Sequence, residues 1–517
     1  MVFYNFDFFK KERLLMRVIT AENMRILETK ANENGLSYEK MMINAGENTG
    51  RVIERYVDTS EKITVLCGKG KNGGDGFVIA GHLKERGYSD VCVILALGEN
   101  KNELCVKMRE KYLGSVRICD YTKNGADCLA AVNESTVIID AVFGIGFSGT
   151  IKGELEELFN TANLRDRRRF AVDIPSGVTS DGENNGVYFK AGVTVTMHAF
   201  KPAHVFAHNL CGETQAVSIG IDEDFCSELY EKYFTFCKDD LKSVIPERRT
   251  DANKGDFGKA LILAGSCNMS GAAYFAVNGA VEAGAGIVYA GFPDKIYSAL
   301  ATRLSEPLIL PMESNNNGRF SQRAFKKISE YMNKSNVTAF GPGIGIDRDT
   351  ALLTEFILLN SKNPVIVDAD GINSVSMNKD ILVKSKCDIV MTPHPGEMAR
   401  LTSKSVSEIQ SDRILSAKSF AEEYGVTLVL KGANTVIASP DGRIFVNSAG
   451  NPGMARGGSG DVLTGIITAF ISRGLTPFDA SCAGVYIHSL AGDFVKNLYG
   501  ENSVTPTRII QSIGRVF

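Results

Sequence analysis

The sequence predicts an α/β protein of two domains, each a three-layer α/β/α arrangement around a mainly parallel sheet. Three observations predict this fold class. The chain has 517 residues, which is more than a single hydrophobic core normally serves. Short apolar runs alternate with segments of helical periodicity, as in parallel sheets whose two faces are covered by helices. The alternation weakens between residues 222 and 256, which separates two series of elements.

The weakened stretch predicts a domain boundary near Ser243. We therefore expect a tail over residues 1–15, a first domain over 16–242 and a second domain over 243–517. The tail is apolar and then basic, whereas a secretory signal carries its charge first, so we expect it to be disordered or loosely docked. The two series of elements show no internal repeat, which indicates two different domains joined end to end.

The composition excludes several classes of protein. The chain is 44% hydrophobic and has a net charge of -3 with both signs dispersed, which argues against a nucleic-acid binder. Its densest basic run, residues 165–169, is interpreted as a solvated helix end. Its 11 cysteines form no C-x-x-C pair, and no apolar run is long enough to span a bilayer. We therefore expect no nucleic-acid or membrane partner and a reducing, cytoplasmic location.

Helix caps and apolar runs give the elements in order. Thr20 and Ser37 can cap the first two helices. In the first half, strands are predicted over residues 63–67, 91–97, 137–142, 170–174, 193–197 and 215–219. In the second half, they are predicted over residues 260–264, 287–290, 337–340, 365–368, 389–392, 427–430 and 443–446. A helix over 276–286 is so rich in Ala and Gly that another surface must press close against it.

A glycine-rich loop follows the first strand of the first half. The segment Gly68-Lys-Gly-Lys-Asn-Gly-Gly-Asp-Gly76 has five glycines in nine residues, which lets backbone approach a ligand closely. Its N–H groups and the helix that follows favour a phosphate. The spacing is neither a Walker loop nor a Rossmann fingerprint. A plain glycine-rich turn is the alternative, but the loop lies where open α/β sheets bind ligands.

Two further strand ends carry carboxylates. They are Asp140, which opens the segment 140–150, and Asp173, which opens Asp-Ile-Pro-Ser-Gly. Such ends converge on one crevice at the switch point of the sheet. With Asp75, Asn72 and Ser176 they form an oxygen-rich cluster suited to a hard cation, with one carboxylate left for acid–base work. For any single Asp, capping a helix is the alternative.

These motifs closely resemble the YjeF N-terminal family, the NAD(P)H-hydrate epimerases, over residues 16–221. The resemblance implies a Rossmann-like fold, a potassium ion ligated by Asn72, Asp140 and Ser176, and Asp173 as the acid–base residue. It also implies that the hydrated dinucleotide is held by Asp173 and two loops, comprising Lys71, Asn72, Gly73, Gly74, Asp75, Gly144, Ile145, Gly146, Phe147, Ser148, Gly149 and Thr150. Lys71 departs from the family, which often has Asn there, and adds charge near the phosphates.

The second half has its own ligand-type strand ends. Gly341-Pro-Gly-Ile-Gly345 and Asp368-Ala-Asp370 each follow a strand. Thr392-Pro-His-Pro-Gly-Glu397 fixes His394 between two prolines, which favours a binding role at the ligand edge over a structural one. Lys431-Gly-Ala-Asn-Thr435 ends another strand.

The most specific segment is Gly457-Gly-Ser-Gly-Asp461, which leads into an apolar helix over 462–473. Small residues at a helix start leave several N–H groups free to bind an oxyanion or phosphate. Asp461 would lie beside them in the first turn, placed to take a proton from a hydroxyl. The alternative is that Asp461 only stabilises the helix start, but capping does not need the preceding glycines and serine.

This half resembles the ribokinase-like superfamily, and within it the NAD(P)H-hydrate dehydratases, over residues 243–517. The resemblance implies Asp461 as the catalytic residue. It implies ADP contacts at Lys431, Gly432, Ala433, Asn434, Thr435 and Gly460. It implies contacts with the hydrated dinucleotide at Ala273, Gly345, His394 and Asp461. The chemistry would resemble a kinase step, with ADP rather than ATP as co-substrate and Mg²⁺ expected beside it.

The leading hypothesis is a bifunctional repair enzyme that epimerises R and S hydrates of NADH and NADPH and dehydrates the S form at the expense of ADP. A small-molecule kinase for a vitamin precursor, with an accessory ligand-binding domain, is the second reading. A third makes the first domain a binding module without activity. We also expect a homo-oligomer, because the helix rich in Ala and Gly invites a close contact.

Overall fold

The structure is a computed structural model that describes residues 16–100, 102–222, 225–236, 241–245, 250, 252–253 and 255–517. The chain divides into two compact units, Met16–Glu231 and Lys232–Phe517. The tail predicted over 1–15 lies outside the described residues. Among the residues described, no helix is both long and apolar enough to cross a membrane.

The N-terminal unit is built on a seven-stranded sheet in the order β4-β3-β2-β5-β6-β7-β8, and every neighbouring pair is parallel. The strands are β2 (Ile63–Cys67), β3 (Val91–Leu95), β4 (Arg117–Asp120), β5 (Val137–Ala141), β6 (Arg168–Val172), β7 (Val193–Met197) and β8 (Glu213–Val217). Because β2 lies between β3 and β5, the direction of winding reverses there. That reversal opens a crevice at the carboxyl ends of β2 and β5.

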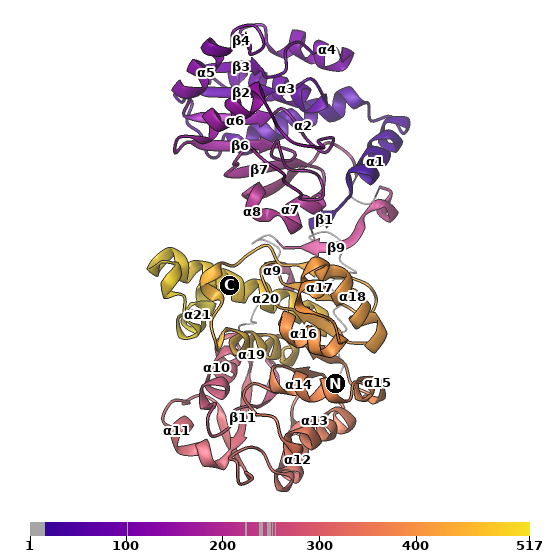
Figure 1. Ribbon diagram of the computed structural model, residues 1–517, viewed down its shortest axis with the longest axis vertical. Coiled ribbons are helices and arrows are strands. Elements are labelled where there is room, and N and C mark those ends of the chain that lie inside the picture. Colours follow the sequence, from indigo (N-terminus) through magenta and orange to yellow (C-terminus); the bar gives the residue numbers. More distant parts are fainter. Residues whose placement is uncertain are drawn as a thin grey trace. The chain divides into compact units, whose positions relative to one another are not determined.

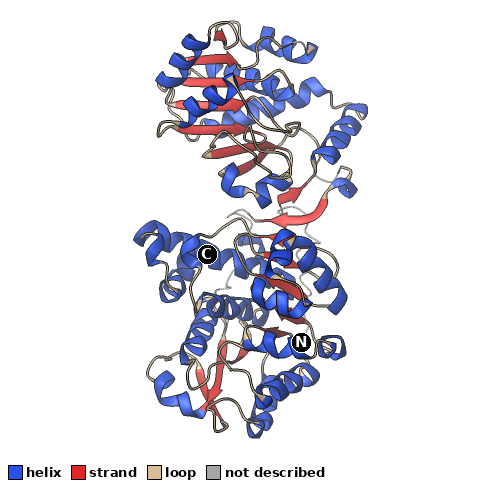
Figure 2. Cartoon of the chain, viewed as in Figure 1, coloured by secondary structure: helices blue, strands red, loops and turns tan. Residues whose placement is uncertain are grey.

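Helices cover both faces of this sheet (Figures 1 and 2). They are α1 (Ala21–Glu33), α2 (Tyr38–Ile53), α3 (Lys71–Glu85), α4 (Glu103–Tyr112), α5 (Gly125–Glu134), α6 (Glu154–Asn163), α7 (Pro202–Phe206) and α8 (His208–Cys211). Val65 on β2 packs in the core formed with α1 to α4. The next residue, Leu66, packs in the core formed with α5 and α6. Successive side chains on a strand point to opposite faces, so both faces of the sheet are buried.

The C-terminal unit has a longer mixed sheet, in the order β9-β18-β17-β16-β15-β14-β13-β10-β11-β12. Its strands are β9 (Glu231–Thr235), β10 (Lys259–Leu263), β11 (Ile287–Pro293), β12 (Leu308–Met312), β13 (Val337–Phe340), β14 (Val365–Val367), β15 (Ile389–Met391), β16 (Thr427–Leu430), β17 (Val436–Ala438) and β18 (Ile444–Val446). Only the β16–β17 and β17–β18 pairs among them are antiparallel. Here β10 lies between β11 and β13 and marks the reversal of winding.

The helices of this unit are α9 (Leu241–Val244), α10 (Ser270–Glu282), α11 (Tyr297–Ala301), α12 (Phe325–Lys334), α13 (Arg348–Asn360), α14 (Asp370–Met377), α15 (Asp380–Lys384), α16 (Pro395–Thr402), α17 (Val406–Ser411), α18 (Arg413–Tyr424), α19 (Ser459–Ser472), α20 (Pro477–Tyr499) and α21 (Pro506–Ser512). Two mainly parallel sheets with helices on both faces confirm the predicted fold class.

The Gly/Ala-rich segment packs within its own unit. A Cβ added at Gly465 of α19 would lie 2.1 Å from the carbonyl oxygen of Ala276, and one added at Gly279 of α10 would lie 2.5 Å from that of Val462. The close surface predicted for this segment is therefore α19 of the same chain. The segment no longer supports the expected homo-oligomer. Its helix also begins at Ser270 and ends at Glu282, earlier than the range 276–286 that we predicted.

Candidate functional site

A cavity of about 580 Å³ lies at the carboxyl ends of the central strands of the N-terminal unit. Of the residues predicted to hold the dinucleotide, the structure lines this cavity with Lys71, Asn72, Asp75, Gly144, Ile145, Gly146, Phe147 and Asp173. The cavity is also lined by residues for which the sequence predicted no role, namely Met24, Arg25, Glu28, Lys69, Gly70, Leu97, Val142, Phe143, Met197 and Lys201.

Asp173 is the most constrained carboxylate in this cavity. It follows β6 with a φ of 70°, a left-handed conformation that a residue with a Cβ adopts only under constraint. Its Oδ2 accepts a hydrogen bond from the backbone N of Ile145 at 2.9 Å. Its Oδ1 accepts one from Thr196 at 3.2 Å and lies 2.8 Å from the ammonium of Lys201.

Lys201 stabilises the ionised form of Asp173. The Lys201 side chain is 1% exposed, and its Nζ also donates to Thr196 Oγ1 at 2.8 Å and Met197 O at 2.9 Å. Burial opposes ionisation of Asp173, but the charge and the hydrogen bond of Lys201 hold its pKa below the ordinary value. Asp173 is therefore a carboxylate at neutral pH. This lysine is the N-cap residue of α7, and the sequence predicted no role for it.

The predicted cation ligands lie together behind Asp173. Asp140 Oδ1 accepts a hydrogen bond from Ser176 Oγ at 2.7 Å, and its Oδ2 accepts one from Ser176 N at 2.8 Å. Burial raises the pKa of Asp140 to about 6, against the hydrogen bonds from Ser176 and Val142. Asn72 Nδ2 donates to the carbonyls of Phe143 at 2.7 Å and Val172 at 3.1 Å. The site is thus rich in oxygen atoms.

Gly73, Gly74 and residues 148–150 were predicted to hold the dinucleotide, but they do not line the cavity. A Cβ added at Gly73 would lie 2.0 Å from Gly68 O, and one at Gly74 would lie 2.7 Å from the Met42 sulfur. These two glycines are therefore required by close packing, and the N–H of Gly73 donates to Gly70 O at 3.1 Å. Residues 148–150 are exposed and do not line the cavity.

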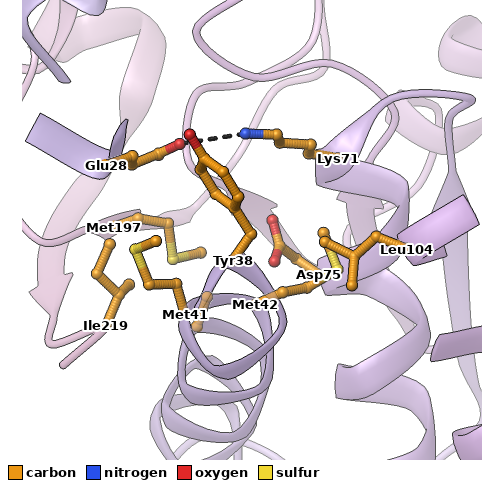
Figure 3. Close-up of a pocket in the computed structure, with 10 residues that line it drawn as sticks. Glu28, Tyr38, Met41, Met42, Lys71, Asp75, Leu104, Met197 and Ile219 are labelled. Atoms are coloured by element: carbon orange, nitrogen blue, oxygen red, sulfur yellow. Dashed lines mark hydrogen bonds and ion pairs between the residues drawn. The ribbon is translucent and has the colours of Figure 1, made fainter. Parts of the chain in front are cut away.

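A smaller pocket of about 70 Å³ adjoins the cavity and shares Glu28, Lys71, Asp75 and Met197 with it. Figure 3 shows its largely apolar wall and the Lys71–Glu28 pair near Tyr38. Lys71 Nζ lies 3.3 Å from Glu28 Oε2 and 4.4 Å from the centre of the Tyr38 ring. The positive charge of Lys71 is thus held at the rim of the cavity.

In the C-terminal unit, Asp461 lies in the first turn of α19, as predicted. Burial, together with the carboxylate of Asp368, raises the pKa of Asp461 to about 7, against the opposing charge of Lys431. A carboxylate with such a pKa is suited to accept a proton near neutral pH. Gly460 lies beside the Lys431 ammonium, since a Cβ added there would be 3.2 Å from Nζ.

Lys431 is held by a buried acid, Asp368, for which the sequence predicted no role. Its Nζ lies 2.9 Å from Asp368 Oδ1. Asp368 also accepts hydrogen bonds from Thr392 Oγ1 at 2.8 Å and Thr464 Oγ1 at 2.7 Å. Burial opposes the charge of Lys431, but Asp368 and Glu397 hold its pKa above the ordinary value. Asp368, which follows β14, therefore links Lys431 at the end of β16 to Thr464 of α19.

The remaining predicted residues surround this point at different depths. Gly345 N donates to Asp370 Oδ2 at 2.8 Å, while Ala273 is buried against Gly265. The His394 side chain is 53% exposed, and its Nδ1 accepts from the backbone N of Gly396 and Glu397 at the start of α16. His394 therefore caps α16, and about half of its side chain remains exposed to solvent.

The loop predicted to contact ADP, residues 431–435, is fixed from α18. The Arg413 guanidinium donates to Ala433 O and, at 2.9 Å, to Leu430 O. Asn434 has a φ of 53°, so the loop turns sharply after β16. No group of three or more His, Cys, Asp or Glu side chains placed to hold a metal occurs in the described part of the chain.

Comparisons with known proteins agree with this division of the molecule. A family model described as YjeF-related protein N-terminus matches residues 38–203, and one described as NAD(P)H-hydrate dehydratase matches residues 260–515. A crystal structure of the ADP/ATP-dependent NAD(P)H-hydrate dehydratase from Bacillus subtilis, co-crystallised with ATP/Mg²⁺, is 29% identical. It covers 54% of this chain and 96% of its own, with a TM-score of 0.47.

Curated relatives match nearly the whole chain. The bifunctional NAD(P)H-hydrate repair enzyme of Moorella thermoacetica is 34% identical over 95% of this chain and 94% of its own. The enzyme of the same name from Thermofilum pendens is 33% identical over 96% and 95%, and that of Escherichia coli is 31% identical over 93% and 90%. On full-length similarity and two family models in the predicted order, this chain belongs to the bifunctional NAD(P)H-hydrate repair enzymes.

Proposed function

We propose that the epimerase and dehydratase reactions of this family are carried by the two sites described above. The observation that supports this most directly is that each unit has one carboxylate set for proton transfer, Asp173 and Asp461. One is held ionised by a lysine, and the pKa of the other is about 7. The domains would follow the predicted division, 16–242 and 243–517.

In the epimerase site, an ionised Asp173 acts first as a base. It takes the hydroxyl proton of the hydrated nicotinamide ring, and the bond from that carbon to the ring nitrogen breaks as an aldehyde forms. The nitrogen then adds back to the other face of the aldehyde carbon, and Asp173 returns the proton to the oxygen. Lys201 keeps Asp173 charged while it is buried. The start of α3, with the free N–H groups of its first turn and the ammonium of Lys71, would bind the dinucleotide phosphates.

A potassium ion fits the oxygen-rich site behind Asp173. Phe143 O and Val172 O converge on the Asn72 amide, and turning that amide would add a third oxygen at the same point. Asn72, Asp140 and Ser176 would then hold the ion, with these two carbonyls completing the set. When bound, the ion supplies positive charge that favours the phosphate-bearing substrate and an ionised Asp173.

In the dehydratase site, the hydroxyl oxygen of the S hydrate attacks the terminal phosphorus of ADP, and Asp461 takes the hydroxyl proton. The bond from that phosphorus to the ADP bridging oxygen breaks, so AMP leaves. The ring nitrogen then expels phosphate from the carbon, and loss of the neighbouring ring proton restores the double bond. Lys431 neutralises charge that develops on the phosphates.

The contacts proposed for the two ligands follow the predicted residues. ADP would lie against residues 431–435 and Gly460, and the hydrated dinucleotide against Ala273, Gly345 and His394. Mg²⁺ would accompany the nucleotide, as in the Bacillus subtilis crystal with ATP/Mg²⁺. We also propose that ADP rather than ATP is the co-substrate, that the protein is cytoplasmic, and that it forms a homo-oligomer. All ten described cysteines are free thiols, which suits a reducing compartment.

The test is recovery of the dihydropyridine absorbance after purified protein, ADP and an epimeric mixture of NADPH hydrate are combined. Full recovery is expected, because the R epimer is converted before dehydration. Recovery limited to the S epimer would refute the epimerase assignment, and no recovery would refute the dehydratase assignment. A stable phosphorylated vitamin-like alcohol would instead favour the kinase reading.

A further inference from the structure

One face of α20 supports the whole segment that leads to Asp461. Its members are spaced by one, four and five residues along the helix, and such positions share a face. They are His488, Ser489, Gly492 and Asp493. Each meets a different point of residues 447–459, which connect β18 to α19. This face, called here the α20 support, belongs to none of the predicted contacts.

Three of the four members hold the first part of the segment. Asp493 accepts hydrogen bonds from Gly450 N and Asn451 Nδ2, both at 2.8 Å. Ser489 Oγ accepts one from Asn447 Nδ2 at 2.9 Å. At Gly492 an added Cβ would lie 2.4 Å from the Met454 sulfur, so the helix and the segment are in direct contact there.

His488 holds the far end, where the chemistry takes place. It is 7% exposed, as is Ser459, the first residue of α19. The His488 Nε2 lies 3.3 Å from Ser459 Oγ. Burial, reinforced by the charge of Lys431, lowers the pKa of His488 to about 4, so the ring is neutral. Ser459 is two residues before Asp461, so its position sets that of the first turn.

We infer that the α20 support preorganises the anion-binding loop of the dehydratase, with His488 as a positioning residue that fixes Ser459. The inference rests on the proposed role of Gly457–Asp461. Small residues make this loop able to approach a phosphate but also make it flexible. Anchors on a rigid helix remove that flexibility before the ligand arrives, so the N–H groups need no reordering as charge develops.

The experiment compares His488→Gln with His488→Asn in the full chain. The amide nitrogen of Gln can occupy the place of Nε2, whereas that of Asn reaches only the place of Nδ1. We expect His488→Asn to lower kcat of dehydration at least tenfold with the Kd for ADP changed less than threefold. His488→Gln should stay within threefold of the unsubstituted chain. The circular dichroism spectrum and the Tm of the same preparations check that the C-terminal unit is folded.

A second arm uses Ser459→Ala, which should match His488→Asn. The double variant should lose no more than either single one, because both remove the same contact. Equal kcat for all variants would overturn the inference. So would an equal loss in His488→Gln and His488→Asn accompanied by a lower Tm, since that result shows packing alone. Absence of dehydration in the unsubstituted chain would refute the proposed function itself.

Discussion

The two candidate carboxylates are prepared in opposite ways. Asp173 is buried beside a lysine and has a pKa below the ordinary value. Asp461 has Asp368 as a neighbour, and its pKa is raised to about 7. Burial raises the pKa of both carboxylates, and the charge of Lys201 reverses this effect at Asp173 whereas that of Asp368 adds to it at Asp461. Asp173, the proposed epimerase base, is therefore ionised near neutral pH. Asp461, the proposed dehydratase base, has a pKa of about 7, so near that pH it is ionised in only about half of the molecules.

Dehydration should accordingly depend on pH near neutrality. Asp461 must be ionised to accept the hydroxyl proton, so kcat should rise through a pKa of about 7 and fall roughly tenfold per pH unit well below it. Asp461→Asn should abolish dehydration and leave epimer exchange unchanged. The measurement is kcat from pH 5.5 to 8.5 at saturating ADP. A flat profile would contradict the role of Asp461.

Epimer exchange should depend on Lys201 through the charge of Asp173. In Lys201→Met, burial is no longer opposed by the ammonium, so the pKa of Asp173 rises and the pH profile moves to higher pH. The rate at pH 7 should fall at least tenfold, about 1.4 kcal/mol. Thr196→Val is the matched control, because it removes a hydrogen bond to Asp173 and keeps the lysine. An unmoved profile in Lys201→Met would exclude this role.

The positions of the acids at strand ends could be predicted from the sequence, but the positions of all their partners could not. Asp140, Asp173 and Asp461 each end a strand or open a helix, so their places follow from the element pattern. Lys201 lies 28 residues from Asp173 along the chain, and nothing local distinguishes it from a surface lysine. Its role follows only from the 2.8 Å contact.

Among the elements, glycine is placed where backbones approach each other. A Cβ added at Gly279 of α10 would overlap the backbone of α19, while one added at Gly271 of the same helix would come no closer than 3.9 Å to Phe275. One glycine is required by packing and the other is not. The two positions therefore form a matched pair within a single helix.

Gly279→Ala should destabilise the protein and Gly271→Ala should not. The added methyl at Gly279 overlaps Val462 O and forces the helices apart, at a cost of about 1–3 kcal/mol. At Gly271 the greater helix propensity of Ala should stabilise by up to about 1 kcal/mol. The midpoint of urea unfolding, followed by circular dichroism, distinguishes the two. Equal midpoints would contradict the close α10–α19 contact.

The strands that the sequence predicted are those with an apolar run. Val193–Met197 and Thr427–Leu430 begin and end where predicted. The sequence did not predict β4, β9, β12 or β17, and three of these were missed for identifiable reasons. β4 is half-exposed and polar, β12 contains Pro311 as an edge strand can, and β17 has three residues. Periodicity is a weak signal at edges and in very short strands.

For the whole molecule, each unit has its own core, so the two activities should be separable. Asp173→Asn should dehydrate only the S epimer, and Asp461→Asn should exchange epimers without recovery. A mixture of these two full-length variants should restore complete recovery, because the exchanged hydrate diffuses from one protein to the other. The measurement is the final absorbance of restored NADPH. Failure of the mixture would indicate that the intermediate must pass within one chain.

The order of the strands along the chain has a consequence for synthesis on the ribosome. β2 and β10 each gain neighbours on both sides as later strands emerge. The Gly457–Asp461 loop and the helix that supports it follow every strand of the chain. The first catalytic site is therefore complete long before the second. A chain interrupted before residue 459 would interconvert the two damaged forms of the cofactor without clearing either.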